Sequence, residues 1–480
     1  MKYQSVRRRM IVALTLAVVL GTDSWRQALL ADDADPEVVR LSEQEQHFNR
    51  ELFKPHTDAS LDAMQTRLQR ILKRRLETLD RQLTLSEPQQ KKLELAGRGS
   101  IKRLIDSIDE LRKLYASAER DQMQQFRFFE EEPAMIMLRK RMRTGPFDDD
   151  SLFRKTLQST LTADQTRKQR DLLERATNSK RPINLDSALD LIRIAKIQKD
   201  VYRIAWNHNG SEVALVQINK PVELFNLPIE KPFRTIDQVK QAVCFDFHDD
   251  GHRVAIAENS HVARIVNLAD GTSIAVDTGQ SQPFVCFSPD GKALVTGGYG
   301  TAVKVWSSAT GELIREIKLG TREGGLTPAI SPDGKILAVG NRNSTTALID
   351  LETGTSLQGL DKIMSHQLCF DPSGKTIAVT YVDGSLTLWD VATGKMIKTA
   401  QAWANELYTV DWSPDGTLLV TGGYHTPVTL WNSTDLSIVN ELESSEWVMD
   451  VKFSPDGSRL LLATLNRDEN DRFVETWAVP

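Results

Sequence analysis

The chain has 480 residues, of which 40% are hydrophobic and 26% are charged, so it is long enough for two or three domains with a sizeable core. Its 60 basic and 65 acidic residues give a formal net charge of −5, which excludes a strong electrostatic bias toward nucleic acid. We expect its three cysteines to be buried apolar thiols rather than disulfides or metal ligands: Cys244, Cys286 and Cys369.

The N-terminus has the pattern of a bacterial secretory signal. The basic cluster Arg7-Arg8-Arg9 precedes an apolar run, residues 10–21, that is shorter than the roughly 20 residues of a transmembrane helix. We therefore expect a signal peptide over residues 1–31, cleaved after Ala31 or after Gly21, and a periplasmic or secreted protein. The alternative is an uncleaved segment that anchors the protein to a membrane.

Residues 36–180 have the composition of a coiled-coil-like helical domain, because glycine is scarce and helix formers dominate. Apolar residues recur every three or four positions and predict one face of a long helix: Leu61, Met64, Leu68, Leu72, Leu76, Leu79 and Leu83. A second such row begins at Ile101. The basic runs Lys73-Arg74-Arg75 and Arg139-Lys140-Arg141 are expected to be solvated helix faces, and Gly97 to end or kink a helix.

Two short motifs in this region are alike. Leu85-Ser86-Glu87-Pro88-Gln89 and Leu161-Thr162-Ala163-Asp164-Gln165 resemble the Leu-Thr-x-x-Gln motif of Spy-like periplasmic chaperones. The same residues also fit a capping box, in which Ser or Thr is followed three residues later by Gln. Under either interpretation, helices are predicted to start at Ser86 and Thr162.

The rest of the chain is marked by glycines that recur with a period near 40, each preceded four residues earlier by a large apolar residue. Successive spacings are 41, 40, 43, 40, 42 and 41 residues: Gly210, Gly251, Gly291, Gly334, Gly374, Gly416 and Gly457. Within one period, the turn Ser288-Pro289-Asp290-Gly291 separates two apolar runs, and Val303 to Trp306 forms a third. Such a period predicts one four-stranded blade per repeat.

These repeats resemble the WD40 family over residues 186–480. Ser-Pro-Asp-Gly is complete in four repeats, but the family's name-giving dipeptide survives only as Trp389-Asp390, and its Gly-His pair is absent. The resemblance implies a seven-bladed β-propeller with an incomplete buried polar network, held more by apolar packing. The predicted fold class is therefore multidomain α + all-β, a helical N-terminal domain followed by the propeller.

Ring closure is predicted from the end of the chain. The seventh repeat runs through Val474 to Trp477 and stops at Pro480, so it lacks residues for a fourth strand. The apolar segment 189–194, just before the first repeat, is expected to complete that last blade and remove a free sheet edge.

The sequence lacks the common motifs of catalytic, phosphate-binding and metal-binding sites. No metal-ligand spacing of histidines, no Gly-x-Ser-x-Gly and no phosphate-binding loop occurs, so we expect no catalytic residue, cofactor or metal. The acidic runs 148–150 and 468–471 lack the alternating spacing of calcium ligands and are expected to be solvated loops.

The predicted functional surface is the rim formed by the turns between second and third strands. Aromatic residues and arginine on an exposed rim favour protein contacts. The candidate residues are Tyr299, Arg342, Tyr381, Trp403, Tyr424 and His425. The alternative is that these rings pack between blades in place of the missing polar network.

The sequence thus predicts a non-enzymatic scaffold outside the cytoplasm that binds a protein partner and not nucleic acid. One alternative is an enzyme or small-ligand binder in the propeller channel, which inward-facing carboxylates or histidines would favour. Another is a chaperone-like or stress-sensing role of the helical domain, which a concave, basic surface would support.

Overall fold

The structure is a computed structural model that describes residues 47–48, 52, 61–116, 134–135, 138, 146–147, 151–217, 220–239, 241–319, 324–341, 345–363, 365–401, 406–424, 426–442, 447–466 and 471–480. The predicted signal segment 1–31 lies outside these residues. Within them, every helix is too short or too polar to cross a membrane.

The chain forms two compact units. One comprises residues 1–54 and 105–139, and the other comprises residues 55–104 and 140–480. In the first unit, the ring of Phe48 packs against Tyr115 with centroids 5.5 Å apart, and both residues are buried. The predicted domain limits, 36–180 and 186–480, stay predictions.

The described residues include four helices of nine or more residues: α4 (Leu61–Leu83), α5 (Glu87–Ala116), α8 (Leu152–Thr160) and α9 (Ala163–Asn178). The predicted apolar row on α4 is confirmed, because Met64, Leu68, Leu72 and Leu79 are buried. Gly97 neither ends nor visibly interrupts α5. A side chain at Gly97 would instead collide with Leu72, so this glycine lets α4 and α5 approach closely.

The expectation of solvated basic runs is wrong for Arg75. Its guanidinium lies 5.6 Å from the ring centroid of Phe147 and 5.4 Å from that of Phe153, and it donates to the Phe147 carbonyl. Lys73, in contrast, is exposed. Stacking on aromatic rings explains why Arg75 is drawn inward. The second run, 139–141, lies outside the described residues.

Both predicted helix starts are confirmed. At Thr162 the capping box is complete: the hydroxyl accepts the Gln165 N–H at 3.2 Å, and Gln165 Oε1 accepts the Thr162 N–H at 3.0 Å. At Ser86 the corresponding bond from its N–H to Gln89 Oε1 is 2.8 Å long. The capping pattern therefore accounts for the helical geometry of both motifs.

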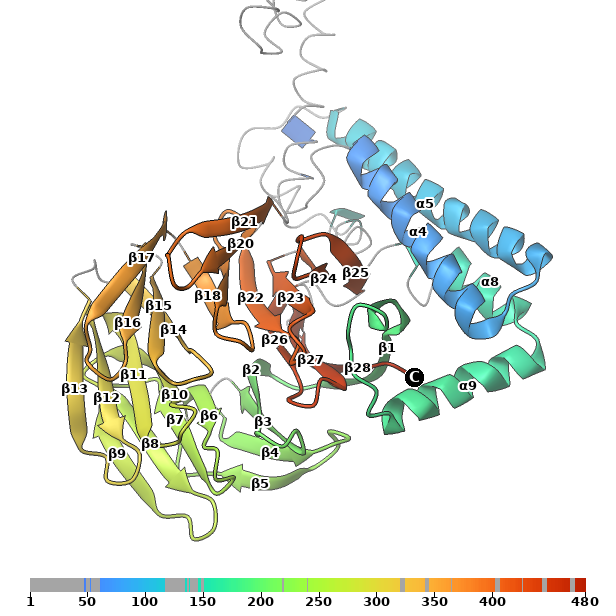
Figure 1. The fold of residues 1–480 in the computed structure, drawn as a ribbon. Coiled ribbons are helices and arrows are strands. Elements are labelled where there is room, and N and C mark those ends of the chain that lie inside the picture. Colours follow the sequence, from blue (N-terminus) through green and yellow to red (C-terminus); the bar gives the residue numbers. More distant parts are fainter. Residues whose placement is uncertain are drawn as a thin grey trace, which may run out of the picture. The chain divides into compact units, whose positions relative to one another are not determined.

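The rest of the second unit is a seven-bladed propeller (Figure 1). The first three blades are β2 (Val201–Trp206), β3 (Glu212–Gln217), β4 (Val222–Asn226) and β5 (Pro232–Ile236); β6 (Ala242–Phe247), β7 (Arg253–Glu258), β8 (Val262–Asn267) and β9 (Ser273–Asp277); and β10 (Ser281–Phe287), β11 (Ala293–Gly300), β12 (Ala302–Ser307) and β13 (Leu313–Lys318).

The next three blades are β14 (Gly324–Ile330), β15 (Ile336–Asn341), β16 (Thr345–Asp350) and β17 (Ser356–Ile363); β18 (Ser365–Phe370), β19 (Thr376–Tyr381), β20 (Ser385–Asp390) and β21 (Met396–Gln401); and β22 (Leu407–Trp412), β23 (Leu418–Gly423), β24 (Thr426–Asn432) and β25 (Ile438–Leu442). Strands within each blade pair antiparallel in chain order. A short extra pairing between β11 and β14 joins the third and fourth blades.

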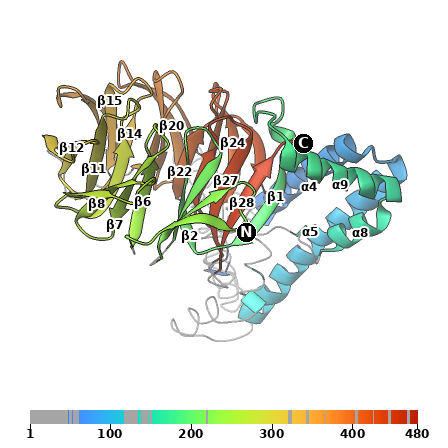
Figure 2. The same ribbon diagram turned by 90° about the horizontal axis from the view of Figure 1, so that it is seen from below.

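The seventh blade confirms the predicted closure. It contains β26 (Trp447–Phe453), β27 (Arg459–Asn466) and β28 (Asp471–Ala478), and its fourth strand is β1 (Ile192–Gln198), which lies antiparallel beside β28 (Figure 2). A short 3-10 helix, η1 (Ala188–Asp190), precedes β1. The seven first strands contact one another in sequence, and β26 contacts β2 across the seam, so the ring is closed.

The seven repeated glycines confirm the predicted hairpin turns, since all have φ between 68 and 74°. These turns also stack from blade to blade. A side chain on Gly457 would meet Cδ of Pro414 in the preceding blade at 3.5 Å, and Gly210 has the same relation to Pro455 across the seam. The proline of one blade's turn therefore packs against the glycine of the next blade's turn.

Apolar clusters fill the space between the blades, as the resemblance implied. Indole hydrogen bonds add a polar contact within blades. Trp306 Nε1 donates to Thr296 Oγ1 at 2.8 Å, and Trp431 Nε1 donates to Thr421 Oγ1 at 2.9 Å.

Candidate functional site

The six predicted rim residues have different environments. Tyr299 is 51% exposed on the third blade, and Tyr424 is half-buried in the turn between β23 and β24. Arg342, Trp403 and His425 lie outside the described residues.

Tyr381 corrects the rim prediction. Its side chain is fully buried in a cluster with Ala338 and Leu348 of the neighbouring blade, and burial raises the pKa of its phenol to about 12. It therefore follows the alternative interpretation, in which a ring packs between blades, and it offers no surface to a partner.

Tyr424 belongs to a group of aromatic side chains that joins the sixth and seventh blades. The centroids of Tyr424 and Trp447 are 4.6 Å apart, and those of Tyr408 and Trp447 are 6.5 Å apart, both edge to face. An isolated antiparallel bridge between Tyr424 and Trp447 holds the turn of the sixth blade beside the start of β26. All three side chains are half-buried, so they are partly accessible.

A carboxylate and an imidazole extend this group. Glu406 Oε2 lies 3.0 Å from His366 Nε2, and the His366 ring packs edge to face on Tyr408 with centroids 5.0 Å apart. The Glu406 carbonyl accepts the N–H of Tyr424 at 2.9 Å. The side chain of Glu406 is 35% exposed. We call these residues the acidic aromatic patch: His366, Glu406, Tyr408, Tyr424 and Trp447.

Four of the five patch residues were missed from the sequence. The repeat alignment contains a signal that would have found them, because they stand at the entrances of first strands. His366 and Tyr408 each lie four residues before the large apolar residue of their repeat, and Glu406 and Trp447 lie six residues before theirs. Aromatic and acidic residues gather at these positions in the fifth, sixth and seventh repeats.

Carboxylates on the first strands bond to the backbone of the next blade. Asp246 Oδ2 accepts the N–H of Phe287 at 2.7 Å, and Asp411 Oδ2 accepts the N–H of Phe453 at 2.8 Å. A first strand has no sheet partner on its inner side. The carboxylates therefore give a hydrogen-bond acceptor to backbone N–H groups that would otherwise be buried without one.

A hydrogen bond of the same kind crosses the seam of the ring, where the seventh blade meets the first. Asp450 in β26 is 2% exposed, and its Oδ2 accepts the N–H of Ile204 in β2 at 3.1 Å. Its Oδ1 accepts the hydroxyl of Thr409 at 3.3 Å. One carboxylate therefore connects the sixth, seventh and first blades.

Burial dominates the electrostatics of the inner strands. Desolvation raises the pKa of Asp246 to about 7 and that of the Cys369 thiol to about 12. It also raises the pKa of Asp411, although Lys452 Nζ lies 3.4 Å from Asp411 Oδ1 and opposes the shift. A thiol held protonated is a poor nucleophile, so Cys369 is not an activated cysteine.

All three cysteines are free, and each is half-buried rather than fully buried as predicted.

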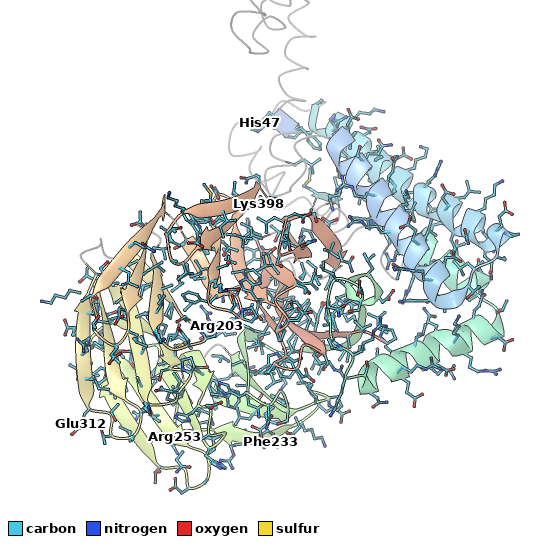
Figure 3. The ribbon with its side chains drawn as sticks, viewed as in Figure 1. His47, Arg203, Phe233, Arg253, Glu312 and Lys398 are labelled. Atoms are coloured by element: carbon cyan, nitrogen blue, oxygen red, sulfur yellow. The ribbon has the colours of Figure 1, made fainter. Side chains whose placement is uncertain are left out.

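The side chain of Arg203 is exposed on β2, and Figure 3 shows it at the centre of the propeller. The carboxylates of Asp246, Asp411 and Asp450 also lie on first strands, but their observed hydrogen bonds connect neighbouring blades.

The described part of the chain contains no group of three or more His, Cys, Asp or Glu residues placed to hold a metal ion. Of the two acidic runs, residues 148–150 and 468–470 lie outside the described residues, and Asp471 Oδ1 accepts a hydrogen bond from Gln198 at 2.7 Å.

Comparison with known proteins identifies related segments within the propeller. Residues 272–307 match the family model "WD domain, G-beta repeat", and residues 358–413 match the model "Anaphase-promoting complex subunit 4 WD40 domain". These segments lie across the second and third blades and across the fourth, fifth and sixth blades.

Three curated relatives illustrate the similarity. The chain is 31% identical over 158 residues to small ribosomal subunit protein RACK1y of Oryza sativa subsp. japonica, covering 31% of this chain and 46% of the relative. It is 36% identical over 111 residues to eukaryotic translation initiation factor 3 subunit I of Coccidioides immitis, covering 23% and 32%. It is 25% identical over 218 residues to COMPASS component SWD3 of Saccharomyces cerevisiae, covering 41% and 69%. The chain thus spans less than half the length of the first two relatives.

Proposed function

We propose that this chain, whose propeller is built of WD40 repeats, is a non-enzymatic scaffold that binds another protein through the acidic aromatic patch. The observation that carries the proposal is the gathering of Tyr408, Tyr424 and Trp447 at the junction of the last blades. Half-buried tyrosine and tryptophan supply large contact area at a low entropic cost, which is why they dominate the energetics of protein interfaces.

The relatives support this class of function by their names. They are described as a ribosomal subunit protein, an initiation factor subunit and a COMPASS component, so each is named as part of a larger assembly. The inner carboxylates argue in the same direction, since they serve as acceptors between blades instead of forming a reactive group.

We further propose that the protein acts outside the cytoplasm of a bacterium, exported by its N-terminal segment. The support is the basic cluster Arg7-Arg8-Arg9 followed by the apolar run 10–21. Sequencing the N-terminus of the mature protein from its own cells tests this. A start after Gly21 or Ala31 is expected, whereas an intact N-terminus in a soluble cytoplasmic fraction would refute export.

The binding proposal is tested by affinity purification of the full chain from its own cells with quantitative mass spectrometry. Tyr408→Ala and Trp447→Ala are compared with Phe233→Ala, a matched control that removes an exposed ring, 46% accessible, from the outer strand β5. A partner that is retained by wild type and the control but lost by both patch variants, each of which still shows the thermal unfolding transition of a folded propeller, is the expected result. Equal recovery by all four proteins would refute the proposal.

A further inference from the structure

We propose that the centre of the propeller holds a carboxylate-binding site, in which the guanidinium of Arg203 and the side-chain amide of Gln367 donate hydrogen bonds to the ligand. The carboxylate belongs either to a small organic acid or to an acidic polypeptide segment. This inference concerns the inner strands β2 and β18, and it does not depend on binding at the acidic aromatic patch.

Arg203 and Gln367 occupy the same position in their repeats, three residues before the large apolar residue that ends the first strand. In both strands a β-bulge directly precedes this residue, so the two side chains have the same local geometry. The structure describes this position in all seven blades, and only Arg203 is exposed there, while Gln367 is half-buried. Figure 3 shows Arg203 at the centre of the propeller, where the first strands contact one another.

The guanidinium of Arg203 has no acceptor. It makes no hydrogen bond and no ion pair with any residue in the described part of the chain. At the equivalent position of the neighbouring blade, Asp450 is 2% exposed. Its carboxylate accepts the N–H groups of Ile204 and Val451 and the hydroxyl of Thr409. Arg203 therefore keeps five N–H donors and a full positive charge available for a ligand.

The side-chain amide of Gln367 supplies a second available donor. Its Oε1 accepts the N–H of Val410 in the next blade at 3.4 Å, which orients the amide and directs Nε2 away from that strand. Nε2 has no acceptor among the described residues. In this layer the acceptors of Asp450 and Gln367 are thus engaged, while the donors of Arg203 and Gln367 are not. Such a surplus of donors is complementary to a ligand that supplies acceptors.

The adjacent layer of side chains, two residues further along the same strands, balances its own charges. Lys452 Nζ lies 3.4 Å from Asp411 Oδ1 and offsets that carboxylate. Burial raises the pKa of Asp246 to about 7, so this carboxyl is largely neutral in mildly acidic solution. Ala205 lies on the same face of β2 as Arg203, and its small side chain leaves the guanidinium uncovered. The charge of Arg203 is therefore the one left to attract an anion.

The chemistry of these donors favours a carboxylate. A guanidinium is a planar fork that forms two parallel hydrogen bonds with the two oxygens of a carboxylate. A phosphate dianion would require a further cation, but Lys452 is already paired with Asp411. The protein around the central strands lowers the local dielectric and strengthens the attraction of Arg203 for an anion.

The test is chemical footprinting of the full chain with phenylglyoxal, which modifies accessible guanidinium groups, followed by peptide mass spectrometry. The probes are succinate and an acetylated, amidated hexaglutamate peptide, and the neutral analogues are succinamide and hexaglutamine at the same ionic strength. A carboxylate probe that occupies most sites should slow modification of Arg203 about fivefold. Arg170, exposed on α9, is the matched control and should react at the same rate throughout.

Each outcome has a distinct meaning. Protection by succinate assigns a small acid, and protection by the peptide alone assigns an acidic segment. Gln367→Ala should raise the half-protecting concentration about fivefold, whereas Gln169→Ala on the exposed face of α9 should not change it. No change in Gln367→Ala would overturn the role of Gln367. The proposal is overturned if neither carboxylate protects, if the neutral analogues protect equally, or if Arg203 of the free protein does not react.

Discussion

Gln89 and Gln165 hydrogen-bond to each other through their side-chain amides. Gln89 Nε2 donates to Gln165 Oε1 at 2.8 Å, and Gln165 Nε2 donates to Gln89 Oε1 at 3.1 Å. Each Oε1 also accepts the N–H of the residue that caps its own helix, Ser86 or Thr162. The two similar motifs therefore form one reciprocal unit that joins the starts of α5 and α9.

This unit predicts a local loss of stability in Gln165→Ala. The substitution removes a capping acceptor and both amide bonds, and we expect a cost of about 1–2 kcal/mol. Amide hydrogen exchange should accelerate at the first turns of α5 and α9 together. Gln169→Ala, one turn later on the exposed face of α9, is the matched control and should change neither. Acceleration confined to α9 would show that the reciprocal bonds contribute nothing.

The helix starts were predictable because a capping box is a local pattern within four residues. The meeting of Gln89 with Gln165 was not, since it depends on the close approach of helices 76 residues apart. Gly97 was misinterpreted for the same reason. Its role is set by Leu72 on a different helix, which no local pattern reveals.

Asp450 is expected to be critical for closing the ring. Asp450→Ala leaves the buried N–H of Ile204 and the hydroxyl of Thr409 without this acceptor, at a cost of about 2–4 kcal/mol in the free energy of unfolding. Asp450→Asn keeps an acceptor oxygen and should cost clearly less. Urea unfolding of the three proteins measures the difference. Equal stability of the alanine variant and wild type would contradict the role of the carboxylate at the seam.

Strand β1 should be indispensable to the propeller. A chain that begins at residue 200 lacks it and exposes the edge of β28, so we expect a lower thermal midpoint and association between molecules. A chain that begins at residue 180 retains the strand and serves as the control. Size-exclusion chromatography and thermal unfolding distinguish them. A monomeric, equally stable shorter chain would disprove closure by β1.

The raised pKa of Asp246 predicts that the stability of the native state depends on pH. Its native pKa, about 7, lies above the ordinary value near 4, so the native state favours the protonated carboxyl. The resulting stability is complete below about pH 4 and is lost as the pH rises through about 7. Because the carboxylate is only half-buried, we expect a loss of about 1–2 kcal/mol.

Asp246→Asn should abolish this loss while keeping an acceptor for Phe287. Relative to wild type, the variant should therefore gain stability between pH 4 and pH 7. Asp237→Asn changes an exposed carboxylate and should follow the wild-type profile. Parallel profiles for wild type and Asp246→Asn would contradict the prediction.

The fold of the propeller was predictable because its determinants repeat. Each glycine ends a turn inside one repeat, and the missing strand after Trp477 pointed to residues before the first blade. The site was predictable only in part. Tyr424 was identified, but its partner Trp447 belongs to the next blade, and their bridge follows from how blades are placed side by side. Burial of Tyr381 likewise depends on its neighbouring blade.

Site-specific photo-crosslinking tests the central claim, binding of a protein at the acidic aromatic patch, most directly. A photoreactive phenylalanine derivative replaces Tyr408 in the patch or, as the control, Phe233 on the outer strand β5, and the cells that normally make the protein are irradiated. We predict one discrete crosslinked protein from position 408 and none from position 233. No crosslink at position 408, or the same products from both positions, would contradict the account.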